Sequence, residues 1–303
     1  MDSEQTEADH FADACGALAA VDLRIERADG LILAEGQLDL PCAIIGRDPD
    51  CEITLTDPDV SMRHACLQVV GGRVLVADMG SRTGVHGAAG GEGFAWLTPT
   101  GATGIGPFQI YLRGPVSAAP TPLDRVPSPF HPSPSLVDRL PKSVLRFLNG
   151  RTAKAEWLVN RVMTFVGRAP GCKINLAGDE VASWHCYFLL SPSGMWVVDL
   201  LSPTGTWVNG EAVRFSRLRS GDEVQVGRFK MTCEYPNGEP SLPPTDPPTG
   251  FRLAKRGTGS SPDIPPHPGV QPPKSPPPPA TPTAERQFVL DRLLQLLAVP
   301  AAG

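Results

Sequence analysis

The chain has 303 residues, a length typical of about two domains. Its 27 Lys and Arg residues are outnumbered by 32 Asp and Glu residues, and the excess comes from the first 21 residues, which carry five acidic side chains and no basic one. The remainder is neutral, which excludes the basic surplus on which sequence-independent nucleic-acid binding depends.

The N-terminal residues 1–18 are predicted to be a disordered acidic segment. They lack the apolar stretch of a secretory signal, and no run of 18 apolar residues occurs in the chain, so we expect a cytoplasmic location and no membrane insertion. The seven cysteines are an odd number without a CxxC pair. This pattern favours buried thiols over a disulfide framework or a metal site.

Two blocks, residues 19–114 and 140–235, are predicted to fold as β-sandwiches. Short apolar runs are separated every eight to twelve residues by Gly, Pro and Asp, and no helical period joins them. The runs in the first block are 23–25, 43–45, 53–55, 66–70 and 74–77, and those in the second are 144–148, 162–166, 187–190, 195–198, 223–226 and 230–233. We therefore predict an all-β protein of two sandwiches.

The two blocks are copies of one unit. Shifting the chain by 121 residues gives 13 identities in 39 ungapped positions, among them Gly46 with Gly167 and His64 with His185. Because loops carry function more often than strands do, the identities at turns are the most informative ones.

The segments outside the blocks are rich in proline. Residues 236–282 hold 17 of the 34 prolines and residues 115–134 hold seven more, which predicts an extended linker (115–139) and a disordered tail (236–281). The two sandwiches would then be beads on a semi-rigid string. Six Ser-Pro or Thr-Pro pairs begin at Thr121, Ser128, Ser133, Ser261, Ser275 and Thr281. One hypothesis is that a kinase phosphorylates this linker or tail and a sandwich binds it; the alternative is an inert spacer.

The last segment, residues 282–299, is predicted to be an amphipathic helix. Val289, Leu290, Leu293 and Leu297 recur at helical spacing, and Thr281 is placed to cap the first turn. We expect this helix to dock on a partner protein, on a second copy of the chain or on one of its own sandwiches. Membrane insertion is disfavoured because the polar face has only two basic residues.

Three motifs follow one another in the first block. Gly46-Arg47 comes after a predicted strand, Ser61-x-x-His64 comes 14 residues later, and Asp78-x-x-Ser81-Arg82-Thr83-Gly84 ends the next hairpin. The second block repeats Gly167-Arg168, His185 and the longer stretch 199–210. In these motifs the chain resembles a bacterial protein with two forkhead-associated (FHA) domains, which are β-sandwiches that bind phosphothreonine peptides.

The resemblance implies a role for each motif residue. A phosphate monoester is nearly a dianion with three acceptor oxygens, so its reader needs a guanidinium, hydroxyl donors and backbone N–H groups that converge from adjacent loops. Arg47 would be the main clamp, Ser61 a hydroxyl donor, and Arg82 with Thr83 a third wall, while Arg63 adds positive charge. Four residues are expected to be structural: Gly46, His64, Gly167 and His185.

Departures from the family divide the two copies. Thr83 and Thr204 stand where the family usually has Asn, which implies weak binding or a different ligand preference in both. The second copy has Ala182 in place of Ser61 and Pro203 in place of Arg82. We therefore predict that the first copy is the reader. The second copy is predicted to be structural or weak, with binding residues Arg168, Ser183, Thr204 and Asn209.

The predicted function is a phosphothreonine-dependent adaptor in a Ser/Thr-kinase pathway. Its partners would be a phosphothreonine-containing protein and a kinase, with no cofactor and no nucleic acid. Ser61, His64 and Asp78 resemble a catalytic triad, but no strained nucleophile turn accompanies them, so we predict no enzyme activity. The alternative is a structural scaffold whose sandwiches and C-terminal helix assemble a complex independently of phosphate.

Overall fold

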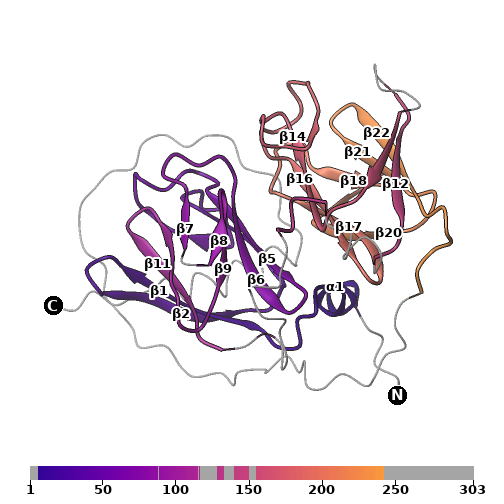
Figure 1. Cartoon of the computed structure of the whole chain (residues 1–303). Helices are drawn as coiled ribbons and strands as arrows, with labels where there is room; N and C mark the ends of the chain where they lie inside the picture. The colour runs from indigo at the N-terminus through magenta and orange to yellow at the C-terminus, as the bar shows by residue number, and fades with distance from the viewer. Residues whose placement is uncertain are drawn as a thin grey trace, which may run out of the picture.

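The computed structural model describes residues 6–87, 89–114, 116, 128–132, 140–149 and 155–241, which form four β-sheets and one helix (Figure 1). The sheets group into two sandwiches, each built from one copy of the repeat. The predicted all-β fold class is confirmed.

The first sandwich contains a five-stranded sheet in the order β2-β1-β11-β10-β7 and a six-stranded sheet in the order β4-β3-β5-β6-β9-β8. Neighbouring strands are antiparallel, except that β3 and β4 are parallel. The strands are β1 (Val21–Arg27), β2 (Ile32–Leu38), β3 (Cys42–Gly46), β4 (Ile53–Thr54), β5 (Ala65–Val70), β6 (Arg73–Asp78), β7 (Val85–Gly87), β8 (Gly90–Gly91), β9 (Phe94–Leu97), β10 (Thr103–Ile105) and β11 (Phe108–Leu112). Burial alternates along β1 and β11, as in strands with only one face on a core.

The second sandwich repeats this plan, with sheets in the orders β13-β12-β22-β21-β18-β19 and β15-β14-β16-β17-β20. Its strands are β12 (Ser143–Phe147), β13 (Glu156–Val159), β14 (Met163–Gly167), β15 (Ile174–Asn175), β16 (Cys186–Ser191), β17 (Gly194–Asp199), β18 (Thr206–Val208), β19 (Glu211–Val213), β20 (Phe215–Leu218), β21 (Glu223–Val226) and β22 (Phe229–Glu234). The strands of the two sandwiches run within residues 21–112 and 143–234, whereas the domain limits 19–114 and 140–235 stay predictions.

The two sandwiches pack against each other through one sheet of each. Every residue of β3, β16 and β17 is buried, although a strand of an isolated sandwich would expose alternate side chains. The second face of these strands is covered by the neighbouring sandwich, because Phe165, Tyr187 and Trp196 belong to the same apolar cluster as the core of the first sandwich. The interface therefore continues the core.

Polar contacts cross this interface as well. The hydroxyl of Tyr187 donates to Oε1 of Gln68, and Arg214 donates to Oε1 of Glu52 from Nη2 at 2.7 Å and from Nε at 3.1 Å. The expectation of separate beads on a string is therefore wrong, because the outer faces of β5 and β16 are too apolar to remain in water.

A helix, α1 (Glu7–Cys15), lies at the junction of the sandwiches beside β20 (Figure 1). Its N-terminus has a capping box between Thr6 and Asp9, and its one buried face contains Phe11, which packs on Trp196 and Phe215 with ring centroids 4.9 and 4.8 Å apart. The prediction that residues 1–18 are disordered is wrong for residues 7–15. Glu7 and Asp13 lie on the exposed face of this helix.

Part of the proline-rich linker is docked too. Phe130 packs between Phe94 of the first sandwich and Phe165 of the second, with centroids 5.5 and 5.6 Å apart, and the carbonyl of Pro129 accepts a hydrogen bond from Met163 N at 2.8 Å. The prediction of an extended, solvated linker is therefore wrong for residues 128–130. The tail (236–281) beyond residue 241 and the predicted helix 282–299 lie outside the described residues.

Replacing Phe11 with Ala is expected to lower the free energy of unfolding by about 3 to 5 kcal/mol, because it leaves a cavity between the sandwiches. Urea denaturation measures the loss. Leu18→Ala is the matched control, since Leu18 is 60% exposed and its truncation should cost little. If both variants lose a similarly small part of the free energy of unfolding, α1 does not contribute to holding the two sandwiches together.

Replacing Glu52 with Ala is expected to cost about 3 kcal/mol, because Arg214 would lose its partner in a largely buried position. Glu156→Ala removes one carboxylate of an exposed ion pair with Arg146 and should cost under about 1 kcal/mol. The same denaturation measurement compares the two. Equal losses would mean that the ion pair between the sandwiches is not shielded from water.

Candidate functional site

Three loops meet at one end of the first sandwich, and we call residues 47–52, 55–64 and 79–84 the first-site loops. Gly46 ends β3 where a Cβ atom would lie 2.1 Å from the carbonyl oxygen of Met62, so only glycine fits. This close approach allows Arg47 N to donate to Ser61 O at 2.9 Å, while Nε of Arg47 donates to Val60 O at 3.2 Å. The exposed Arg47 side chain is thus held beside Ser61.

Side chains connect the second and third of these loops. Ser61 Oγ accepts from the backbone N–H of Arg82 at 3.1 Å, and Thr83 Oγ1 donates to Asp59 O at 3.0 Å. The Arg82 guanidinium donates to the carbonyl of Pro58. Four of the predicted residues are therefore brought together at one edge: Arg47, Ser61, Arg82 and Thr83.

His64 lies beneath these loops and is fully buried. Its Nδ1 accepts from Ser61 N at 3.2 Å, so Nε2 carries the proton and donates to Gly84 O at 2.9 Å. One imidazole thus connects the loop of Ser61 to the loop of Arg82.

The third loop is shaped by two residues absent from the predicted site. The carboxylate of Asp78 accepts from Gly80 N at 2.9 Å and from the backbone and hydroxyl of Ser81, whose Oγ accepts from Gly84 N at 2.9 Å. Their recurrence as Asp199 and Ser202 was the sequence signal that could have identified them.

The second sandwich repeats the backbone geometry, and we call residues 168–173, 176–185 and 200–205 the second-site loops. Arg168 donates from N to Ala182 O at 3.0 Å and from Nε to Val181 O at 2.6 Å. His185 accepts from Ala182 N at 3.1 Å and donates to Gly205 O at 3.1 Å. The copies therefore share the arginine and histidine contacts that hold the loops, and the second copy lacks the contacts that Ser61 and Arg82 add in the first.

The remaining predicted residues of the second copy are scattered. Thr204 Oγ1 donates to Glu180 O at 2.8 Å, as Thr83 does to Asp59. Ser183 contributes its carbonyl, which accepts from Ala169 N at 2.9 Å. Asn209 is at the opposite end of β18, where its amide donates to Asp222 Oδ1 at 2.8 Å and accepts from Glu223 N at 2.9 Å. The structure does not bring Asn209 to the site.

Arg63 lies in the second of the first-site loops, where its Cα atom would be 3.0 Å from a Cβ atom added at Gly46. Burial lowers the pKa of His185 below its ordinary value of 6.5, and among the smaller contributions the positive charge of Arg63 lowers it further. The Arg63 guanidinium makes no hydrogen bond or ion pair with any described residue.

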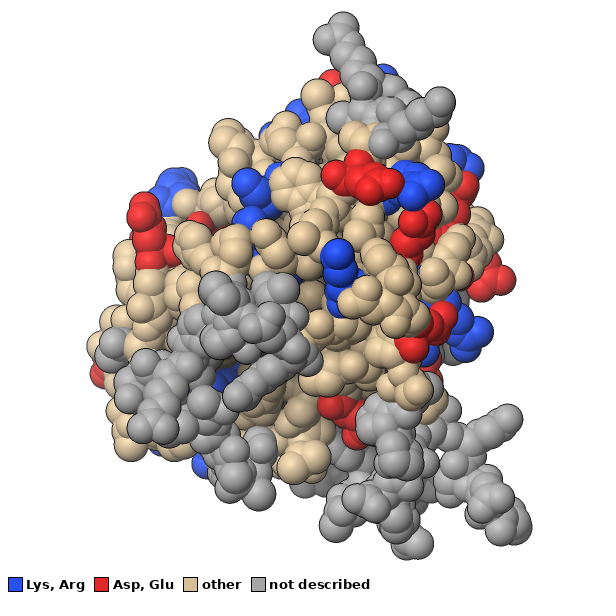
Figure 2. Space-filling view, turned by 45° about the vertical axis from the view of Figure 1, so that its right-hand side comes forward, with Lys and Arg blue, Asp and Glu red and all other residues tan. Residues whose placement is uncertain are grey.

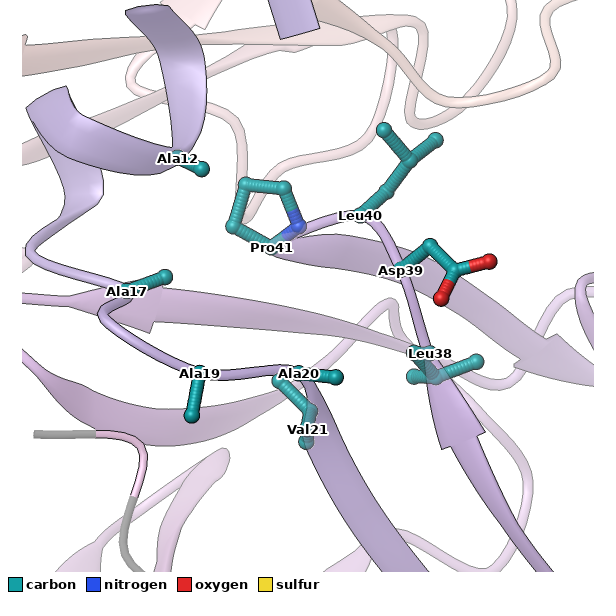
Figure 3. Close-up of a pocket in the computed structure, with 9 residues that line it drawn as sticks. All are labelled: Ala12, Ala17, Ala19, Ala20, Val21, Leu38, Asp39, Leu40 and Pro41. Carbon is teal, nitrogen blue, oxygen red and sulfur yellow. The ribbon is translucent and has the colours of Figure 1, made fainter. Parts of the chain in front are cut away.

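Other surfaces of the described residues offer less chemistry. No group of three or more His, Cys, Asp or Glu side chains in this part of the chain could hold a metal ion. On the face that Figure 2 shows, basic and acidic side chains are interspersed. A shallow hollow beside α1 is lined mainly by small apolar residues such as Ala12, Ala17 and Val21 (Figure 3). Its Pro41 precedes β3, whereas Arg47 follows the other end of that strand.

None of the described helices is long and apolar enough to cross a membrane. All seven cysteines are buried and unpaired, as the sequence predicts.

Comparison with known proteins identifies the repeated unit. The FHA domain family model matches residues 43–87 and 164–227. The glycogen accumulation regulator GarA of Mycobacterium tuberculosis is 36% identical over 97 residues, which cover 31% of this chain and 60% of GarA. The oxoglutarate dehydrogenase inhibitor of Corynebacterium efficiens is 33% identical over 102 residues, which cover 33% of this chain and 72% of the inhibitor.

Among solved structures, the FHA domain of a Chlamydia trachomatis protein is similar, with 21% identity, a TM-score of 0.29 and coverage of 31% of this chain and 96% of that domain. The chain spans about 60% of the length of the GarA relatives that it matches.

The lowered pKa of His185 predicts acid sensitivity. Below a pH of about 6.5 the unfolded chain binds a proton at this imidazole that the folded chain resists, so the free energy of unfolding should fall as the pH falls from 7 to 5.5. His185→Gln should reduce this fall. Denaturation at pH 8, where the imidazole is neutral in both states, measures the stability lost with the hydrogen bonds of His185 alone. If the free energy of unfolding of the variant depends on pH as that of the original chain does, His185 is not the source of the acid sensitivity.

Proposed function

Because the chain belongs to the FHA domain family, we propose that it is an adaptor that binds phosphothreonine peptides through its first sandwich. The observation that carries this proposal is the convergence of Arg47, Ser61 and the third loop on one exposed edge. An enzyme active site is not proposed, since the same residues serve a binding role.

The donors at this edge suit a phosphate dianion. Ser61 Oγ accepts the N–H of Arg82, which leaves its own O–H to donate outward. Arg47 uses Nε for Val60 O, and no described residue accepts from its terminal nitrogens. A guanidinium and a hydroxyl are thus available side by side, and charge-assisted hydrogen bonds to phosphate are the strong kind.

The second sandwich is proposed to bind phosphate weakly by itself. Ala182 has no hydroxyl to replace that of Ser61, and Pro203 has neither the charge nor the N–H of Arg82. Arg168 keeps the same attachment as Arg47 and supplies the remaining charge. Thr83 and Thr204 are both engaged with backbone carbonyls, so neither is proposed to hold the peptide backbone as the family's Asn does.

The proposed partners follow from this chemistry. They are proteins phosphorylated on threonine and the Ser/Thr kinase that modifies them, with the chain's own linker or tail as a further candidate ligand. The matched relatives are named as a regulator and an inhibitor, which favours control by binding over catalysis. We propose a cytoplasmic setting for this activity.

A phosphate-independent scaffold is the second candidate, and the fused core favours it. A chain whose sandwiches share one apolar cluster presents a single rigid surface to several partners. Docking of the predicted helix 282–299 on a partner or on a second copy belongs to this candidate.

Titration of the full chain with a phosphothreonine peptide library and with its unphosphorylated twin distinguishes the candidates. We expect binding of the phosphorylated library alone, and losses of roughly 10- to 150-fold in Arg47→Ala and Ser61→Ala, because each removes a charge-assisted contact worth about 1.5 to 3 kcal/mol. Arg113→Ala, at the other end of the first sandwich, is the matched control. Equal binding of both libraries would support the scaffold.

A further inference from the structure

The two sets of site loops lie on either side of one tryptophan. Trp184 belongs to the second-site loops, and a Cβ atom added at Gly80 of the first-site loops would lie 3.1 Å from its Nε1. A Cβ atom at Gly171, which follows Arg168 in the second-site loops, would lie 2.9 Å from its Cη2. Two glycines therefore allow a loop of each site to approach the same indole.

This proximity is built into the interface. Trp184 packs edge-on against Phe165 with centroids 4.9 Å apart. Glu52, in the same loop as Arg47, pairs with Arg214, which also donates to the carbonyl of Asp199. The carboxylate of Asp199 in turn accepts from Ser202 N at 3.0 Å in the second-site loops. These contacts fix the distance between the first-site loops and the second-site loops.

Positive charge is available on both sides of Trp184. Among the described residues, no group accepts from the terminal nitrogens of Arg47 or Arg168. The positive charge of Arg63 in the first sandwich contributes to lowering the pKa of His185 in the second. The nearby carboxylate of Glu180 is paired with Arg228 at 3.4 Å. The second site has Ala182 where the first has Ser61, so Arg168 is the group that would bind a phosphate there.

We propose that the two sets of loops form one composite site for a peptide segment that carries two phosphothreonines. The first phosphate binds at Arg47 and Ser61, and the second binds at Arg168. This inference rests on the proposed function of the first sandwich. A site too weak to act alone contributes when the first phosphate is engaged, because rigid spacing gives the second phosphate a high effective concentration.

The test is a fluorescence-anisotropy titration of the full chain with degenerate synthetic peptides that carry one phosphothreonine, or two separated by about two to about eight residues, a reach of roughly 7 to 28 Å. We expect the doubly phosphorylated peptides to bind at least about 10-fold more tightly over a narrow range of spacings. Sedimentation should show one peptide and one chain in the complex.

Variants separate the two halves of the site. Arg168→Ala should reduce the affinity for doubly phosphorylated peptides to that for singly phosphorylated ones, whereas Ala182→Ser should increase the gain from the second phosphate. Arg219→Ala, an exposed arginine at the other end of the second sandwich, is the matched control and should preserve the gain.

The outcomes distinguish this inference from the proposed function. A gain of no more than about twofold at every spacing, which is the statistical factor for two equivalent phosphates, would overturn the composite site while the first sandwich remains a reader. A gain that survives Arg168→Ala, or a complex of two chains on one peptide, would overturn it equally. If no phosphorylated peptide binds, the proposed function fails and the composite site fails with it.

Discussion

The structure depends on the burial of one sheet of each sandwich against the other. Strands β3, β16 and β17 have no exposed residue, so neither sandwich could keep this face in water at an acceptable free energy. Phe11 from α1 and Phe130 from the linker fill the edges of the same interface. Residues of the acidic N-terminal segment and of the proline-rich linker thus complete the core between the sandwiches.

The duplication has preserved the residues that hold the loops and varied the residues that face outward. His64 and His185 make the same pair of hydrogen bonds, and both arginines donate from Nε to the equivalent carbonyl. Ser61 and Arg82, in contrast, have become Ala182 and Pro203. Because the histidine and arginine contacts hold the loops in both copies, the second copy keeps the fold without the loop contacts of Ser61 and Arg82.

Because the two sandwiches share one core, their relative orientation is fixed, which a flexible linker alone would not achieve. Glu52 and Arg214 connect the loop of Arg47 to the end of β17 across a largely buried ion pair. Such a pair contributes little net stability compared with apolar packing, but it is strict about geometry, since either charge alone would be costly to bury. We therefore expect this pair to constrain the orientation of the site loops more than it adds to stability.

The sequence by itself determined the β-sandwich class, the duplication and the buried thiols, because short apolar runs, turn residues and aligned motifs are local signals. It also indicated Arg47, Ser61, Arg82 and Thr83, since each recurs or falls in a motif at a turn. The tertiary structure alone decided that α1 forms, that Phe130 docks and that Trp184 lies between the two sites. Those outcomes depend on apolar surfaces that belong to different copies, and residues distant along the chain become neighbours only when the sandwiches have packed.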